Sequence, residues 1–129
     1  MELQSPGGTT GEKEETVTQA KTAAALESGS VPVYATPAMV ALMEGAAIRA
    51  LDPFLPPGHT SVGMDVSITH LRPSPLGTTV RAKATVTGVE GRLVTLRVEA
   101  YQGTKRIGEG MHRRAVIDIA KFMARAIER

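Results

Sequence analysis

The chain has 129 residues and a formal net charge of +2, which indicates one domain and gives no sign of a nucleic-acid partner. It contains no cysteine, which excludes disulfides, thiolate nucleophiles and cysteine-ligated metals and is compatible with the cytoplasm. The first residues lack the pattern of a signal peptide and no apolar run approaches the roughly 18 residues that span a bilayer, so we expect a cytoplasmic protein without a membrane partner.

The N-terminal part of the chain is polar at first and ambiguous afterwards. Residues 1–13 contain Ser-Pro-Gly-Gly and Thr-Thr-Gly and are predicted to form a flexible arm, followed by a single domain over residues 14–129. The string from Glu14 to Leu26 suits a strand by its threonines and a helix by its run of alanines. We favour the strand.

A buried helix is predicted to begin at Thr36 and to end at Asp52. Thr36 is a favourable N-cap residue and Pro37 is favoured at the first helical position. Pro53 cannot continue a helix and disfavours helical backbone one residue earlier. The segment between these signals is apolar nearly all round, which is typical of a helix that is buried on most sides.

Four strands are predicted after this helix. Beyond Gly58 the sequence alternates with period two, and the even-numbered positions from Val62 to Ile68 form an apolar face. Further strands are predicted over residues 80–86, 94–100 and 105–119, with a short helix over residues 122–129. Consecutive strands with short connections pair antiparallel, which predicts an α+β fold with a curved antiparallel sheet wrapped around the long helix. Pairing of two copies would protect a sheet edge, so we expect a dimer.

Glu44 is the first candidate for chemistry, because it places a carboxylate in the middle of the apolar helix. Burying an ionised carboxylate without a partner is costly, so Glu44 is expected to be paired, protonated or placed at a cleft. In the alternative interpretation, Glu44 faces solvent along a narrow polar strip near Arg49.

His70 and Thr36 are the other two candidates. His70 continues the apolar face of its strand, and its imidazole could act as a general base or polarise a carbonyl; a core histidine bonded to a backbone carbonyl fits the same pattern. Capping alone explains Thr36, although a helix N-terminus also suits an oxyanion. Thr36 and Glu44 are about 12 Å apart along the helix, so either a substrate spans them or a second subunit completes the site.

The sequence predicts no cofactor and no metal. His59 and His112 are not at metal-ligand spacing with each other or with a pair of carboxylates. Neither a phosphate-binding glycine loop nor a Gly-x-Ser-x-Gly nucleophile motif is present.

Three segments, over residues 33–50, 61–70 and 110–118, carry a more specific pattern. A threonine precedes the helix, Leu-Met-Glu-Gly lies within it, and Ile-Thr-His ends the next strand. With this spacing the chain resembles the fluoroacetyl-CoA thioesterase family of hot-dog-fold proteins from about Val31 to Phe122. The resemblance implies a hot-dog fold, hydrolysis of an acyl-CoA, and a homodimer with active sites at the subunit interface. It leaves open whether dimers assemble into tetramers.

The resemblance also implies roles for individual residues. Thr36, Glu44 and His70 match the family's active site. Glu44 would act as base or as nucleophile toward the thioester carbonyl, and His70 would act as general base or electrostatic partner. Thr36 would orient or stabilise the polarised carbonyl. Gly63 matches a glycine that lines the acyl pocket, and Arg114 matches an arginine near the site.

Two departures from the family pattern bear on the substrate. The stretch from Glu27 to Tyr34 has Tyr34 as its only aromatic residue, where the specialised family members carry phenylalanines, and Gly45 stands in place of a tryptophan. We assign Tyr34 to the substrate-binding residues and predict a more open pocket that accepts a short or small acyl group. The alternative function is a non-catalytic module that binds acyl-CoA or another small molecule on the same fold.

Overall fold

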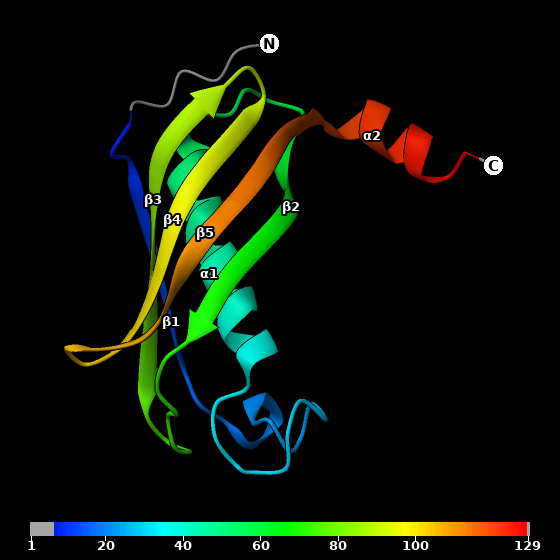
Figure 1. The fold of residues 1–129 in the computed structure, drawn as a ribbon. Coiled ribbons are helices and arrows are strands. Elements are labelled where there is room, and N and C mark those ends of the chain that lie inside the picture. Colours follow the sequence, from blue (N-terminus) through cyan, green and yellow to red (C-terminus); the bar gives the residue numbers. More distant parts are fainter. Residues whose placement is uncertain (1–6, 129) are drawn as a thin grey trace.

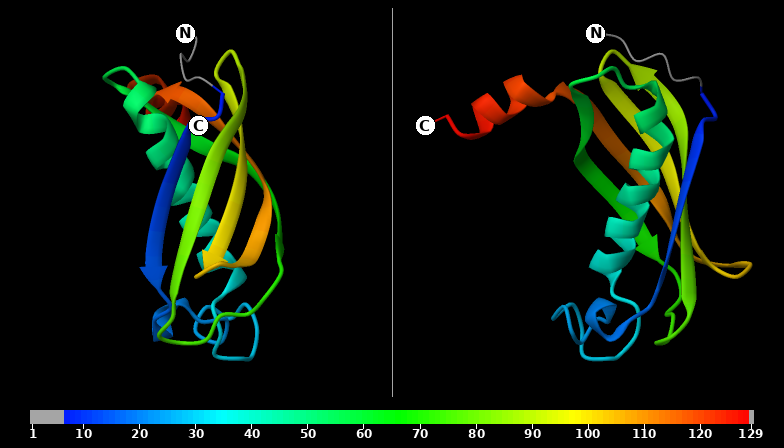
Figure 2. Two further views of the ribbon diagram at one scale, coloured as in Figure 1. Left: turned by 90° about the vertical axis from the view of Figure 1, so that its left-hand side faces the viewer. Right: turned by 180° about the vertical axis from the view of Figure 1, so that it is seen from behind.

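The computed structural model describes residues 7–128, and its strands form one curled antiparallel sheet around a long helix (Figure 1). Figure 2 shows the helix α1 against the concave side of this sheet from two further directions, with α2 extending away from it. The strands are β1 Thr10–Thr16, β2 His59–His70, β3 Thr79–Glu90, β4 Leu93–Gln102 and β5 Lys105–Asp118, and the helices are α1 Thr36–Leu51 and α2 Ile119–Ala126. The predicted α+β arrangement is confirmed.

The order of the strands in the sheet is β1-β3-β4-β5-β2. The hairpins β3–β4 and β4–β5 agree with the prediction, and their turns contain Gly91 and Gly103 at positive φ. The expectation that β2 pairs with the next strand in the chain is wrong, because β2 pairs with β5. Pro73 and Pro75 lie in the connection from β2 to β3, where they cannot donate to a ladder. In the strand order given above, β2 forms one edge of the sheet and β1 forms the other.

The N-terminal prediction needs correction. Strand β1 begins at Thr10, so residues 10–13, which were expected in a flexible arm, pair with β3. The expected strand after Glu14 ends at Thr16, and a short 3₁₀ helix over Gln19–Lys21 and a series of turns follow it. A Cβ atom at Gly11 would collide with the backbone of α1, so this glycine allows β1 to lie directly on the helix. Residues 1–6 lie outside the described residues.

The helix α1 covers the predicted segment and ends where Pro53 was expected to end it. Its buried residues are Ala38, Met39, Leu42, Met43, Ala46, Ala47, Ala50 and Leu51. The expected N-cap role of Thr36 is wrong, since Ala35 occupies the N-cap position and no side chain caps the helix. The C-terminal helix α2 begins at Ile119, three residues earlier than predicted, because the Asp118 side chain accepts a hydrogen bond from the Lys121 N–H. Within residues 7–128, no helix combines the length and apolar content needed to cross a bilayer.

Candidate active site

The strand β2 changes its register against β5 between Gly63 and Asp65. An extra residue at such a bulge reverses the side-chain alternation. The predicted apolar face is therefore wrong before the bulge, where Gly63 faces α1 and Met64 is 51% exposed. Beyond the bulge, His70 faces the helix as predicted. The bulge thus places Gly63 and His70 on the same side of the sheet.

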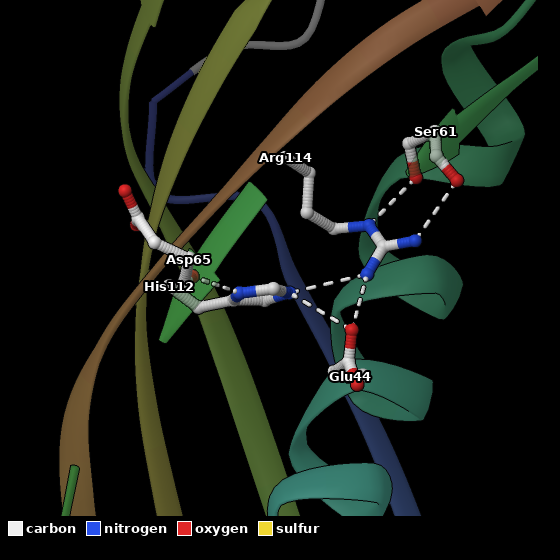
Figure 3. Close-up of polar contacts among 5 residues, drawn as sticks. All are labelled: Glu44, Ser61, Asp65, His112 and Arg114. Carbon is white, nitrogen blue, oxygen red and sulfur yellow. Dashed lines mark hydrogen bonds and ion pairs between the residues drawn. The ribbon is translucent and has the colours of Figure 1, made fainter. Parts of the chain in front are cut away.

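Arg114 lies at the centre of a polar cluster between α1 and the sheet (Figure 3). Its side chain is 4% exposed, its Nε donates to Ser61 Oγ at 2.8 Å, and its Nη2 donates to the Ser61 carbonyl at 2.9 Å. Nη1 lies 3.3 Å from Glu44 Oε2 and 3.1 Å from His112 Nε2, and His112 Nδ1 lies 2.8 Å from the Asp65 carbonyl. Burial lowers the pKa of Arg114, and the neighbouring Glu44 carboxylate opposes this shift.

Glu44 is paired with this arginine and partly open to solvent, with a side-chain exposure of 39%. The alternative interpretation, a solvated strip near Arg49, is not supported, because Arg49 instead donates to the Glu12 carbonyl. A Cβ atom at Gly63 would lie 2.6 Å from Glu44 Oε2, so a side chain here would displace this carboxylate from its present position. Arg114 holds one carboxylate oxygen of Glu44, and the structure gives the other no hydrogen bond within residues 7–128.

Thr36 and His70 form a second polar group at the N-terminus of α1. Thr36 Oγ1 lies 2.8 Å from His70 Nδ1, which explains why this hydroxyl does not cap the helix. Burial lowers the pKa of His70, so the neutral imidazole is favoured near neutral pH. The pair borders an open cavity of about 340 Å³, whose wall includes Val31, Val33, Tyr34, Leu71 and Pro73.

The lowered pKa of His70 predicts a pH-dependent stability. The unfolded chain binds more protons than the folded protein below about pH 6.5, so the free energy of unfolding should fall as the pH drops through this range. Above it both states are neutral at this position and the effect vanishes. Urea unfolding at about pH 7.5 and about pH 5.5 should show a larger loss for the wild type than for His70→Gln. Equal losses in the two proteins would contradict the prediction.

Tyr34 and Gly45 lie differently from what the sequence suggested. Tyr34 is 1% exposed and its hydroxyl donates to Glu15 at 2.5 Å, so this hydroxyl is already engaged and only the edge of the residue reaches the cavity. Burial, followed by the bond to Glu15, raises the pKa of Tyr34. Gly45 faces β1, where a Cβ atom would lie 2.7 Å from Lys13 Cδ. Gly45 does not line the cavity beside Thr36 and His70, and the expectation that it opens the acyl pocket stays a prediction.

The predicted site residues thus form two groups within one chain. Thr36 contacts His70, whereas Glu44 contacts Arg114 and lies against Gly63. No hydrogen bond or ion pair among residues 7–128 joins the two groups, and their helical members are about 12 Å apart along α1.

Sequence reasoning missed the participation of His112 and Ser61. Both side chains are buried, with exposures of 1% and 6%. The period-two alternation of β5, which buries His112, Arg114 and Val116 on one face, was a signal that could have located His112. No pattern in the sequence pointed to Ser61, because the bulge decides which way it faces. No cluster of three metal-ligating residues is found within residues 7–128.

Comparisons with known proteins agree with this architecture. A family model described as fluoroacetyl-CoA-specific thioesterase matches residues 17–120. A fluoroacetyl-CoA thioesterase from Streptantibioticus cattleyicolor is 46% identical over 93 residues, which cover 72% of this chain and 67% of that protein. A solved structure of FlK, as a variant in complex with acetyl-CoA, matches with a TM-score of 0.87 and 38% identity over 94% of this chain and 96% of that one. A thioesterase superfamily member from Thermus thermophilus matches with a TM-score of 0.88 and 36% identity over 95% and 90% of the two chains.

Proposed function

The chain belongs to the fluoroacetyl-CoA-specific thioesterase family and is a hot-dog-fold acyl-CoA thioesterase, and we propose that Glu44, His70 and Thr36 carry out its hydrolysis reaction. Water adds to the thioester carbonyl, the carbon–sulfur bond breaks, and the products are the free acid and CoA. Water and side chains supply every group that this reaction needs, so we propose that it requires no cofactor. The absence of cysteine is compatible with a reducing compartment, which supports a cytoplasmic location.

The observation that carries the assignment is the placement of Glu44. Arg114 is buried and holds one oxygen of this carboxylate beside the gap left by Gly63. A carboxylate held in this way is a group that can accept a proton from water or attack the thioester carbon. His70 and Thr36 then bind and polarise the carbonyl oxygen at the start of α1, where backbone N–H groups lack partners within the helix.

The separation of the two groups supports a homodimer with shared sites. Reacting groups must come within about 3 Å of one carbonyl, which groups about 12 Å apart along a helix of the same chain cannot both do. Gly63 lies toward the start of β2 and His70 lies at its end, and β2 is an edge strand with one free side. Antiparallel pairing with the same strand of a second copy reverses its direction. Glu44 of one copy would then stand beside His70 and Thr36 of the other.

The cavity beside Thr36 and His70 supports a short or small acyl group. The residues that line it include the aliphatic Val31, Val33 and Leu71 together with Tyr34, and no phenylalanine is among them. A FlK variant has been solved in complex with acetyl-CoA, whose acyl group has two carbons. We propose that the protein accepts short aliphatic acyl groups and does not single out the fluorinated one.

Thiol release from a panel of acyl-CoAs tests this proposal. We expect kcat/KM to be highest among acetyl-, propionyl- and butyryl-CoA and to fall roughly 10- to 200-fold for bulkier aryl groups, since a mismatched group in an apolar pocket costs about that much. Rates for fluoroacetyl-CoA should exceed those for acetyl-CoA by no more than the ratio of their uncatalysed hydrolysis. A larger preference for the fluorinated substrate would overturn the assignment of the acyl class.

A further inference from the structure

We propose that His112 is a positioning residue, whose Nε2 lone pair holds the Arg114 guanidinium in the orientation in which Nη1 reaches Glu44. The inference rests on the proposed role of Glu44 in hydrolysis. It concerns a side chain that is 1% exposed, lies 4.0 Å from the Glu44 carboxylate and contacts the arginine directly.

The tautomer of His112 follows from its two neighbours. Arginine carries N–H donors and no acceptor, so the 3.1 Å contact between Arg114 Nη1 and His112 Nε2 requires a lone pair on Nε2. The ring proton therefore sits on Nδ1 and is donated to the Asp65 carbonyl at 2.8 Å. This carbonyl belongs to the residue that resumes pairing directly after the bulge in β2. The bulge that also brings Gly63 to Glu44 thus supplies the acceptor for the imidazole. Figure 3 shows the His112 imidazole between Asp65 and Arg114.

Every nitrogen of the Arg114 guanidinium is then directed by a partner. Ser61 accepts from Nε and Nη2, and these two bonds hold one edge of the plane. Nη1 is divided between His112 Nε2 and Glu44 Oε2, its only acceptors within residues 7–128. The bond to Glu44, at 3.3 Å, is the longest of the set, and Glu44 is the most exposed member, so Glu44 alone does not determine where Nη1 points. The buried His112 imidazole therefore fixes the direction in which Nη1 points.

The charges around Glu44 make the expected consequence specific. Arg114 and His112 face it from β5, and Asp52 at the end of α1 also acts on Arg114. When Nη1 loses its acceptor, the guanidinium can turn away from the carboxylate. The carboxylate then loses the contact that fixes its position, so turnover should fall while substrate binding is retained.

Two substitutions and one spectrum test the proposal. His112→Leu keeps the bulk of the side chain without an acceptor, whereas His112→Gln keeps a carbonyl oxygen that can reach Arg114. We expect His112→Leu to lower kcat roughly 10- to 100-fold with little change in KM. His112→Gln should remain within about threefold of the wild type, as should the control His59→Gln, which lies outside both groups.

Other outcomes would overturn the proposal. Equal losses in the leucine and glutamine variants, or a leucine variant whose kcat stays within about threefold of the wild type, would indicate that His112 only fills space. Nitrogen-15 NMR of the neutral wild-type imidazole, recorded at about pH 8, should show the proton on Nδ1, and a proton on Nε2 instead would contradict the geometry. This spectrum needs neither a folded variant nor turnover, so it separates a failure of the inference from a failure of the proposed function.

Discussion

Replacing Glu44 by glutamine is expected to lower kcat by roughly 10²- to 10⁴-fold, the contribution that a positioned acid–base side chain makes to catalysis. Glutamine has nearly the same shape and can still accept a hydrogen bond from Arg114, so the fold and the contact at Gly63 should persist. What is lost is the carboxylate that takes a proton from water or attacks the thioester. Thiol release from acyl-CoA under saturating substrate measures kcat directly, and KM should change little.

A matched control separates this effect from the loss of any surface carboxylate. Glu109 has a side-chain exposure of 42%, close to that of Glu44, and it also pairs with an arginine, Arg106, at 2.9 Å. Glu109→Gln should retain activity within about twofold, because exposed ion pairs contribute little. If Glu44→Gln retained more than about a tenth of the wild-type kcat, Glu44 would be a structural residue, and His70 would be the next candidate for the base.

Mixed dimers should recover activity that each parent variant lacks. If Glu44 of one copy serves the same site as His70 of the other, a dimer of His70→Ala with Glu44→Gln contains one site with both defects and one intact site. Such a dimer should show about half the wild-type activity, because a twofold-symmetric dimer has two equivalent sites. Co-expression with two different affinity tags, followed by sequential purification, would isolate the mixed species for the thiol-release assay.

The matched control for this experiment pairs two variants from the same group. A mixed dimer of His70→Ala with Thr36→Ala has one defect in each site, so it should show no recovery. Recovery in neither mixture would place the complete site within one chain. A monomer by light scattering at assay concentration would remove the shared-site model altogether. Recovery in the first mixture alone would assign Glu44 and the Thr36–His70 pair to opposite subunits.

The largest departures from sequence-based expectation lie in β2. Period-two alternation correctly indicated a strand, and it correctly directed His70 toward the helix. It failed at Met64, because one unpaired residue at the bulge reverses the pattern, and Gly63, a glycine inside the strand, was the one residue that could have signalled it. The same limitation applies to the pairing of β2 with β5, since alternation describes the two faces of a strand and carries no information about its neighbours.

Local signals by themselves located α1 and the strands that follow it. Pro53 ends α1, and glycines make the hairpin turns. The carboxylate of Glu44 in an apolar helix identified this residue as a candidate for chemistry. Only the tertiary structure decided what these residues contact. Glu44 meets an arginine 70 positions away, and the Thr36 hydroxyl, whose residue type suits a helix cap, bonds instead to His70, 34 positions away. Propensity and capping act over a few residues along the chain, whereas the partner of a buried polar group depends on which distant segments the packing of the sheet on the helix brings together.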